Sequence, residues 1–128
     1  PAADARRFDA GTPPVPNIYA GLAGIAIVEE AGVAAIEEHV RGLNTRLIEG
    51  LEELGARVTT PRDPARRGPL VCARSTDVDA LVAELAGERI VVSSRDDSVR
   101  ISAHLYNTDE DVDRVLDALR RRRRLLSS

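Results

Sequence analysis

Two short segments of the chain carry residue types that are suited to binding an anion. The first lies near the start and reads Arg7-Phe8-Asp9-Ala10-Gly11-Thr12-Pro13-Pro14. Gly11 lets the backbone approach a ligand closely, and the Thr12 hydroxyl beside a free N–H suits an anionic oxygen. The alternative interpretation of this segment is a plain proline-rich turn.

The second segment is an expected strand, Val99-Arg100-Ile101-Ser102. Side chains alternate along a strand, so Val99 and Ile101 are expected on a helix-covered face and Arg100 and Ser102 on the opposite face. An arginine held between stiff β-branched neighbours can bind a carboxylate through both arms of its guanidinium. The alternative is a solvated arginine on an open sheet face.

Other chemically capable residues favour structural roles. Cys72 stands in an apolar run and is expected to pack as a small hydrophobic residue. His39 and His104 have no visible partner in the sequence pattern. The run 120–124 is all arginine; it could contact a phosphate backbone, but it also complements the C-terminal end of a helix. The charged stretch 62–67 is expected to be an exposed loop.

Composition excludes several kinds of chemistry. The chain has 128 residues and a net charge of −3, and all 18 basic residues are arginine. Without lysine it has no lysine nucleophile, so we assign it no catalytic residue of its own. A single cysteine rules out an internal disulfide, and two distant histidines argue against a metal site. The mild acidity argues against a nucleic-acid partner.

The sequence also gives an expectation about the kind of protein this is. No secretory signal is visible, and the apolar stretch 10–28 is interrupted by prolines, so we expect neither export nor membrane insertion. We predict a cytoplasmic protein. The absence of methionine indicates that Pro1 is not a translation start, so the chain is expected to be a fragment.

Helical patterns dominate the first half of the chain. Residues 1–16 are expected to be an extended segment because prolines disfavour helix there. Asn17 is expected to cap a helix over 18–31 that is apolar nearly all round. Apolar residues at steps of three and four predict a longer helix over 33–54, which Gly55 ends.

Short strands alternate with helices in the second half. Capping patterns at Thr76 and Thr108 each open an amphipathic helix. The expected strands cover 56–60, 69–74, 89–93 and 98–102, the last two joined as a hairpin. This order predicts an α+β fold: a small, mainly antiparallel sheet of about four strands with helices on one face, preceded by a long helix. We expect an inter-domain segment at 1–16 and a small C-terminal domain at 17–128.

Two of these segments, in this order, resemble the C-terminal part of the class V aminotransferases. They are RFDAGTPP, followed by an apolar helix, and VRISAHLYNTDEDVDRVL. The resemblance spans about 7–119 and implies a small domain of a pyridoxal-phosphate enzyme of fold type I, related to the cysteine desulfurases. It implies a large cofactor-binding domain upstream that supplies the lysine. The isolated chain is therefore expected to be inactive.

The resemblance also implies roles for three residues. Gly11 and Thr12 would reach the cofactor phosphate of the neighbouring subunit in a homodimer. Arg100 would hold the α-carboxylate of an amino-acid substrate. These implied roles agree with the residue chemistry above and favour binding over a plain turn and a solvated arginine.

The segment before Arg100 lacks the residues that distinguish cysteine desulfurases from other members of the family. Cysteine desulfurases carry a His-His-Cys loop shortly before the equivalent of Arg100, whereas this chain has Ser93-Ser94-Arg95-Asp96-Asp97-Ser98. A persulfide needs a thiolate on a mobile loop, so desulfurase activity is disfavoured and an aminotransferase-like reaction is favoured. We expect Arg95 in a turn and of little consequence for substrate. The competing hypothesis is a free-standing α+β ligand-binding or regulatory module.

Overall fold

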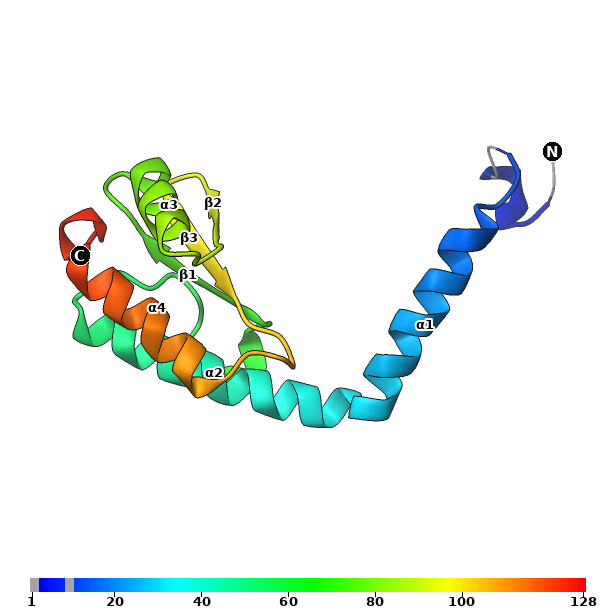
Figure 1. Ribbon diagram of the computed structural model, residues 1–128, viewed down its shortest axis with the longest axis horizontal. Coiled ribbons are helices and arrows are strands. Elements are labelled where there is room, and N and C mark those ends of the chain that lie inside the picture. Colours follow the sequence, from blue (N-terminus) through cyan, green and yellow to red (C-terminus); the bar gives the residue numbers. More distant parts are fainter. Residues whose placement is uncertain (1–2, 9–10) are drawn as a thin grey trace. The chain divides into compact units, whose positions relative to one another are not determined.

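The computed structural model describes residues 3–8 and 11–128 (Figure 1). The chain divides into two compact units, Pro1–Val33 and Ala34–Ser128. The first unit contains a short 3-10 helix, η1 (Ala5–Phe8), and the α-helix α1 (Val15–Ala31). The second contains nearly all of α2 (Val33–Glu53) and every element after it.

Helix α1 begins earlier than the sequence pattern predicts. The expected cap at Asn17 is wrong, because the helix starts at Val15 with Pro14 in the N-cap position and no side-chain cap. Pro16 lies in the first turn, where the missing N–H of proline breaks no helical hydrogen bond. Prolines at this point therefore open the helix instead of delaying it.

The side chains of α1 are apolar but not buried. None of its residues is buried in the structure, and the Tyr19 and Ile27 side chains are 68% and 62% exposed. A helix without a polar face needs cover on several sides. The other exposed large apolar residues of α1 are Val15, Ile18, Leu22 and Ile25.

Helix α2 confirms the predicted amphipathic helix to within one residue. Its buried residues recur at steps of one, three and four along one face: Val40, Leu43, Asn44, Leu47, Ile48 and Leu51. Gly55 follows the helix with φ +77, a left-handed conformation that glycine adopts without steric cost. The N–H of Ala56 then bonds the Leu51 carbonyl at 3.0 Å and closes the helix end.

The sheet is antiparallel and has three strands rather than about four. Its order is β1 (Leu70–Arg74), β3 (Ser98–Ser102), β2 (Ser93–Arg95). The expected strand at 56–60 forms only an isolated bridge between Val58 and Ala73. The strand expected at 89–93 is also displaced: the first strand of the hairpin, β2, begins only at Ser93, the last residue of the predicted range.

Two short helices follow β1 and β3 and both start at polar caps. Helix α3 (Val78–Gly87) is capped by Asp77, which accepts from the N–H of Ala80, and not by the predicted Thr76. Helix α4 (Asp109–Arg121) has the predicted capping box between Thr108 and Asp111. A last 3-10 turn, η3 (Arg123–Leu125), ends the unit, and η2 (Pro64–Arg66) lies in the loop before β1.

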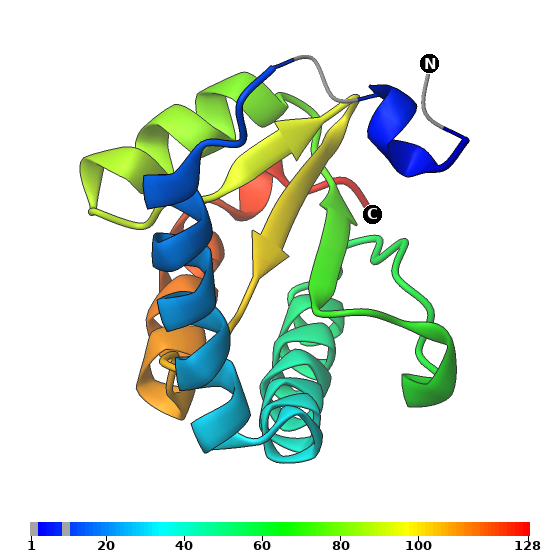
Figure 2. The same cartoon turned by 90° about the vertical axis from the view of Figure 1, so that its right-hand side faces the viewer.

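One hydrophobic cluster joins the helices α2, α3 and α4 to one face of the sheet. The strands contribute Val71, Ala73, Val99 and Ile101, each at most 8% exposed. The three strands lie side by side in Figure 2. The unit is therefore α+β, as predicted, with helices on one face, called here the inner face. The opposite face of the strands is called the outer face.

Among the described residues, no single helix combines the length and the apolar composition needed to cross a membrane. Helices α1 and α2 reach that length and composition only when they are taken together.

Candidate functional site

Strand alternation places Arg100 on the outer face. In β3, Val99 and Ile101 are buried while Arg100 is half-buried. Arg100 lies opposite Cys72 of β1 and Ser93 of β2, and residues that face each other across a ladder share a face. The β-branched neighbours of Arg100 are fixed in the core, so the direction of its side chain is fixed too.

The Arg100 side chain lines an open hollow of about 240 Å³. The hollow is formed by Thr59, Leu70, Cys72, Arg95, Asp96, Ser98 and Arg100. The Arg100 guanidinium makes no hydrogen bond or ion pair within the part of the chain that the structure describes. A guanidinium with free donors is suited to a bidentate bond with an incoming carboxylate.

Many other arginines of this unit are already paired. Arg46 donates three hydrogen bonds of 2.7–2.9 Å to Asp113, which raise the pKa of its guanidinium. Arg74, on the outer face of β1, is paired with Asp97 of the hairpin turn. These pairs connect elements of the fold, whereas Arg100 is left available to a ligand.

The run of arginines at the end of α4 also belongs to ion pairs. Arg122 forms ion pairs with Glu88 at 2.6 Å and with Glu84 at 3.0 Å, and Arg121 forms one with Glu88 at 2.5 Å. The hydrogen bond from Arg122 and, to a smaller extent, the one from Arg121 lower the pKa of the Glu88 carboxyl. The run therefore ties α4 to α3, which agrees with the interpretation as a charged helix end.

Gly11 and Thr12 lie in the first unit, and both are exposed. Asp9 and Ala10 of the same segment lie outside the described residues. Gly11 has φ +153, where a side chain would be strained, and no atom lies within 4 Å of the position a Cβ would take. The Thr12 hydroxyl has no hydrogen-bond partner among the residues that the structure describes. Gly11 and Thr12 are thus open to a ligand, and their role in binding a phosphate stays a prediction.

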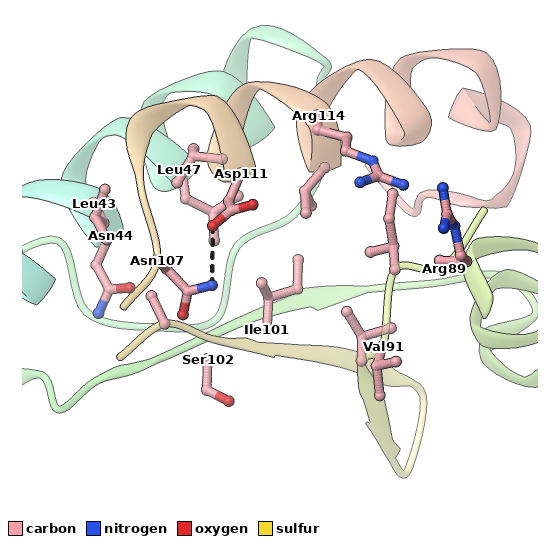
Figure 3. Close-up of a pocket in the computed structure, with 15 residues that line it drawn as sticks. Leu43, Asn44, Leu47, Arg89, Val91, Ile101, Ser102, Asn107, Asp111 and Arg114 are labelled. Carbon is pink, nitrogen blue, oxygen red and sulfur yellow. Dashed lines mark hydrogen bonds between the residues drawn. The ribbon is translucent and has the colours of Figure 1, made fainter. Parts of the chain in front are cut away.

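A second cavity, of about 170 Å³, lies on the helix side of the sheet (Figure 3). The figure shows Ile101 pointing toward the helices and Ser102 pointing away from them. Asn107 donates to Asp111 at 3.2 Å in this cavity. The Thr108 N–H, and then Asn107, lower the pKa of the Asp111 carboxyl. The cavity is thus bounded by a helix cap and by core residues, away from Arg100.

Three expectations about single residues change. Cys72 was expected to pack as a buried residue, but it is half-exposed and lines the Arg100 hollow, because alternation sends Val71 and Ala73 inward. His39 does have a partner, since its Nε2 lies 2.8 Å from the Asn107 carbonyl oxygen. His104 stacks on Tyr106 with ring centroids 5.4 Å apart.

Arg95 was expected in a turn, but it is the last residue of β2 and lines the hollow with Arg100. The signal was present in the sequence. A two-residue turn at Asp96-Asp97 pairs Arg95 with Ser98, and Ser98 is two residues from Arg100. An even separation along a strand keeps two residues on one face.

This chain is similar in sequence to proteins of one known family. The family model described as aminotransferase class V matches residues 2–115. The chain is 25% identical to the uncharacterized aminotransferase YcbU of Bacillus subtilis, over 90% of this chain and 31% of the relative. It is 33% identical to a probable cysteine desulfurase of Pyrococcus abyssi, over 88% of this chain and 32% of that protein.

Solved structures agree with these matches. A cysteine desulfurase from Thermococcus onnurineus NA1, in its apo form, superposes with a TM-score of 0.87 and 27% identity, over 96% of this chain and 34% of that one. A NifS-like protein superposes with a TM-score of 0.77 over 94% of this chain and 37% of that one, also at 27% identity. The chain spans about a third of the length of the curated relatives that it matches. With nearly its whole length covered by the family model, it belongs to the class V aminotransferases.

Proposed function

We propose that this chain is the C-terminal region of a pyridoxal-phosphate-dependent enzyme that acts on an amino acid, and that Arg100 binds the substrate α-carboxylate. The observation that carries the proposal is Arg100 itself, a half-buried residue that lines a hollow and whose guanidinium has no partner among the described residues. A planar guanidinium recognises a carboxylate through two parallel hydrogen bonds.

Gly11 and Thr12 fit one end of the cofactor. The exposed Thr12 hydroxyl and the open space at Gly11 suit a phosphate group, which we propose belongs to the cofactor of the partner subunit in a homodimer. Pyridoxal phosphate, when bound, supplies an electron sink for chemistry at the α-carbon of an amino acid. The lysine that holds it must come from sequence outside this chain, which contains none.

Amino transfer is the reaction that we propose over sulfur release. The relatives include both aminotransferases and desulfurases, so they support the cofactor class and leave the reaction open. The segment Ser93–Ser98 supports amino transfer, because it holds no thiol and is fixed as two strand ends and a tight turn. Persulfide formation needs a thiolate that can reach the substrate.

The test is a product assay on a protein that contains this chain and its lysine-bearing large domain. With an amino acid and a 2-oxo acid, we expect amino transfer, seen as the new amino acid and the new oxo acid in equal amounts. With cysteine, we expect no sulfide above the uncatalysed rate. Sulfide release without amino transfer would overturn the proposed reaction. The 128-residue chain alone is the control and is expected to catalyse neither reaction, because it has no lysine.

A further inference from the structure

We propose that Arg95 and Arg100 together bind an amino acid whose side chain carries a second anionic group, in the simplest case a dicarboxylic amino acid. The inference rests on the proposed function, in which Arg100 holds the α-carboxylate. It extends that function by assigning Arg95 to the second anion and so names a class of substrate.

The hairpin register places both side chains on the outer face. Arg95 of β2 lies opposite Ser98 of β3, and Ser98 is two residues before Arg100 on the same strand. The two arginines are therefore diagonal neighbours, a relation that puts residues about 7–8 Å apart. Each has a long side chain that rises from the same hollow, so two carboxylates of one small molecule can be held at once.

The charges around the hollow leave both guanidiniums unneutralised. Among the residues that the structure describes, neither Arg95 nor Arg100 forms a side-chain hydrogen bond or an ion pair. Asp96 also lines the hollow, but it pairs with neither of them. Asp97, the other acid of the turn, is held by Arg74. Two unpaired guanidiniums beside the single carboxylate of Asp96 leave the hollow with a net positive charge, which favours an anionic ligand.

The width of the arrangement favours two separate anionic groups over one. Arg95 and Arg100 rise from different strands, and Arg100 lies two residues beyond the residue that faces Arg95. A single carboxylate occupies the donors of one guanidinium fork. A second group on the ligand is needed to engage the second fork. Glutarate has two such groups, butyrate has one, and inorganic phosphate has a single compact centre.

Binding to the 128-residue chain tests the inference without any catalysis. Calorimetric titration should show glutarate binding about tenfold more tightly than butyrate or inorganic phosphate, as expected when a second guanidinium–carboxylate pair forms. Arg95→Gln should remove that preference, and Arg100→Gln should weaken the binding of both glutarate and butyrate. Arg66→Gln is the matched control, because Arg66 is an exposed arginine of the same unit that does not line the hollow. An unchanged preference in Arg95→Gln, or phosphate binding as tight as glutarate, would overturn the inference.

Kinetics of the longer protein separate this inference from the proposed function. Arg95→Gln should lower kcat/KM for glutamate by about tenfold and leave glutamine unchanged, because only glutamate has the second carboxylate. If wild type and Arg95→Gln handle the two amino acids alike, the inference fails and the proposed function stands. If no amino acid reacts while Arg95 still determines the glutarate preference, the proposed function fails and the inference stands.

Discussion

The two faces of β1 and β3 differ sharply, although their residues alternate along the same strands. The inner face consists of Val71, Ala73, Val99 and Ile101, all buried in the hydrophobic cluster. The outer face carries Cys72 and Arg100, both half-buried, beside the hollow. Successive residues of one strand therefore alternate between packing in the core and lining the hollow.

The difference teaches where stability and binding are located in this unit. Apolar area removed from water contributes about 25 cal/mol per Å², and in these strands that burial is on the inner face. The outer face contributes less burial and holds the unpaired guanidinium of Arg100. Substitutions at neighbouring positions should therefore affect different measurements, and the predictions below test that separation.

The largest expected effect is on catalysis at the outer face. In the longer protein, Arg100→Ala should raise KM for the amino acid and lower kcat/KM by roughly 10²–10³, because removing one partner of a desolvated ion pair costs about 2–5 kcal/mol. The Tm of the protein and the absorbance of the bound cofactor should stay unchanged. Steady-state kinetics and thermal unfolding on the same samples measure both.

Two further variants sharpen this result. Arg100→Lys should not restore activity, because one ammonium group cannot reproduce the planar fork of donors. Arg66→Ala should behave like wild type, since Arg66 is exposed and lies outside the hollow. An Arg100→Ala protein that unfolds at lower temperature would show that the outer face also stabilises the fold, and the separation would be wrong.

The next effect is on stability at the inner face. Ile101→Ala should lower the free energy of unfolding by about 2–4 kcal/mol, from lost burial and the cavity left in the core. Ile101 is only 8% exposed and follows Arg100 directly in β3. Ile101→Ala and Arg100→Ala therefore change neighbouring residues on opposite faces of the strand. Urea unfolding of the chain measures the loss. If KM for the folded protein rises as much as in Arg100→Ala, the two faces are not independent.

Sequence patterns with one dominant physical cause predicted the fold well. The steps of three and four in 33–54 require a helix with one buried side, and α2 buries that side. The Thr108–Asp111 spacing satisfies two N–H groups at once, and the capping box forms there. Alternation in 98–102 alone determined the face of Arg100.

The failures occurred where tertiary contacts or register decide the outcome. Cys72 sits in an apolar run, but only the pairing with β3 shows that its side of the strand is uncovered. The position of Arg95 depended on a turn at Asp96, where φ is +52, rather than on local strand propensity. The segment at 56–60 runs beside β1 but makes only one bridge, a distinction that propensity does not contain.

A smaller effect is expected at the cap of α4, one of the helices behind the inner face. Thr108→Ala should lower the free energy of unfolding by about 1 kcal/mol, because the N–H of Asp111 loses its hydroxyl acceptor. Chemical denaturation at neutral pH measures this. Binding of carboxylates at the outer face should be unchanged, and a loss of binding would mean that the cap positions the hollow.

The same cap makes the stability of the unit depend on pH. The Thr108 N–H and Asn107 lower the pKa of the Asp111 carboxyl in the folded protein. Its contribution to stability is therefore present above the unfolded pKa, near 3.8, and is lost as the pH falls through the folded value. Asp111→Asn should lose less stability than wild type as the pH falls below about 5, measured by urea unfolding at each pH.

The smallest effect is expected for Cys72→Ala, which changes the outer face without touching a charge. Cys72 is half-exposed, so the variant should alter the free energy of unfolding by no more than about 0.5 kcal/mol. Amino transfer by the longer protein should be retained, because Cys72 lies on a strand paired residue by residue with β3 and cannot move toward the substrate as a loop thiol would. Cys72→Ser is the matched variant, since it keeps a small polar group at the same place. If both variants abolish turnover while glutarate still binds through Arg100, then the Cys72 thiol takes part in the chemistry. Amino transfer without a thiol would then be the wrong description of the reaction.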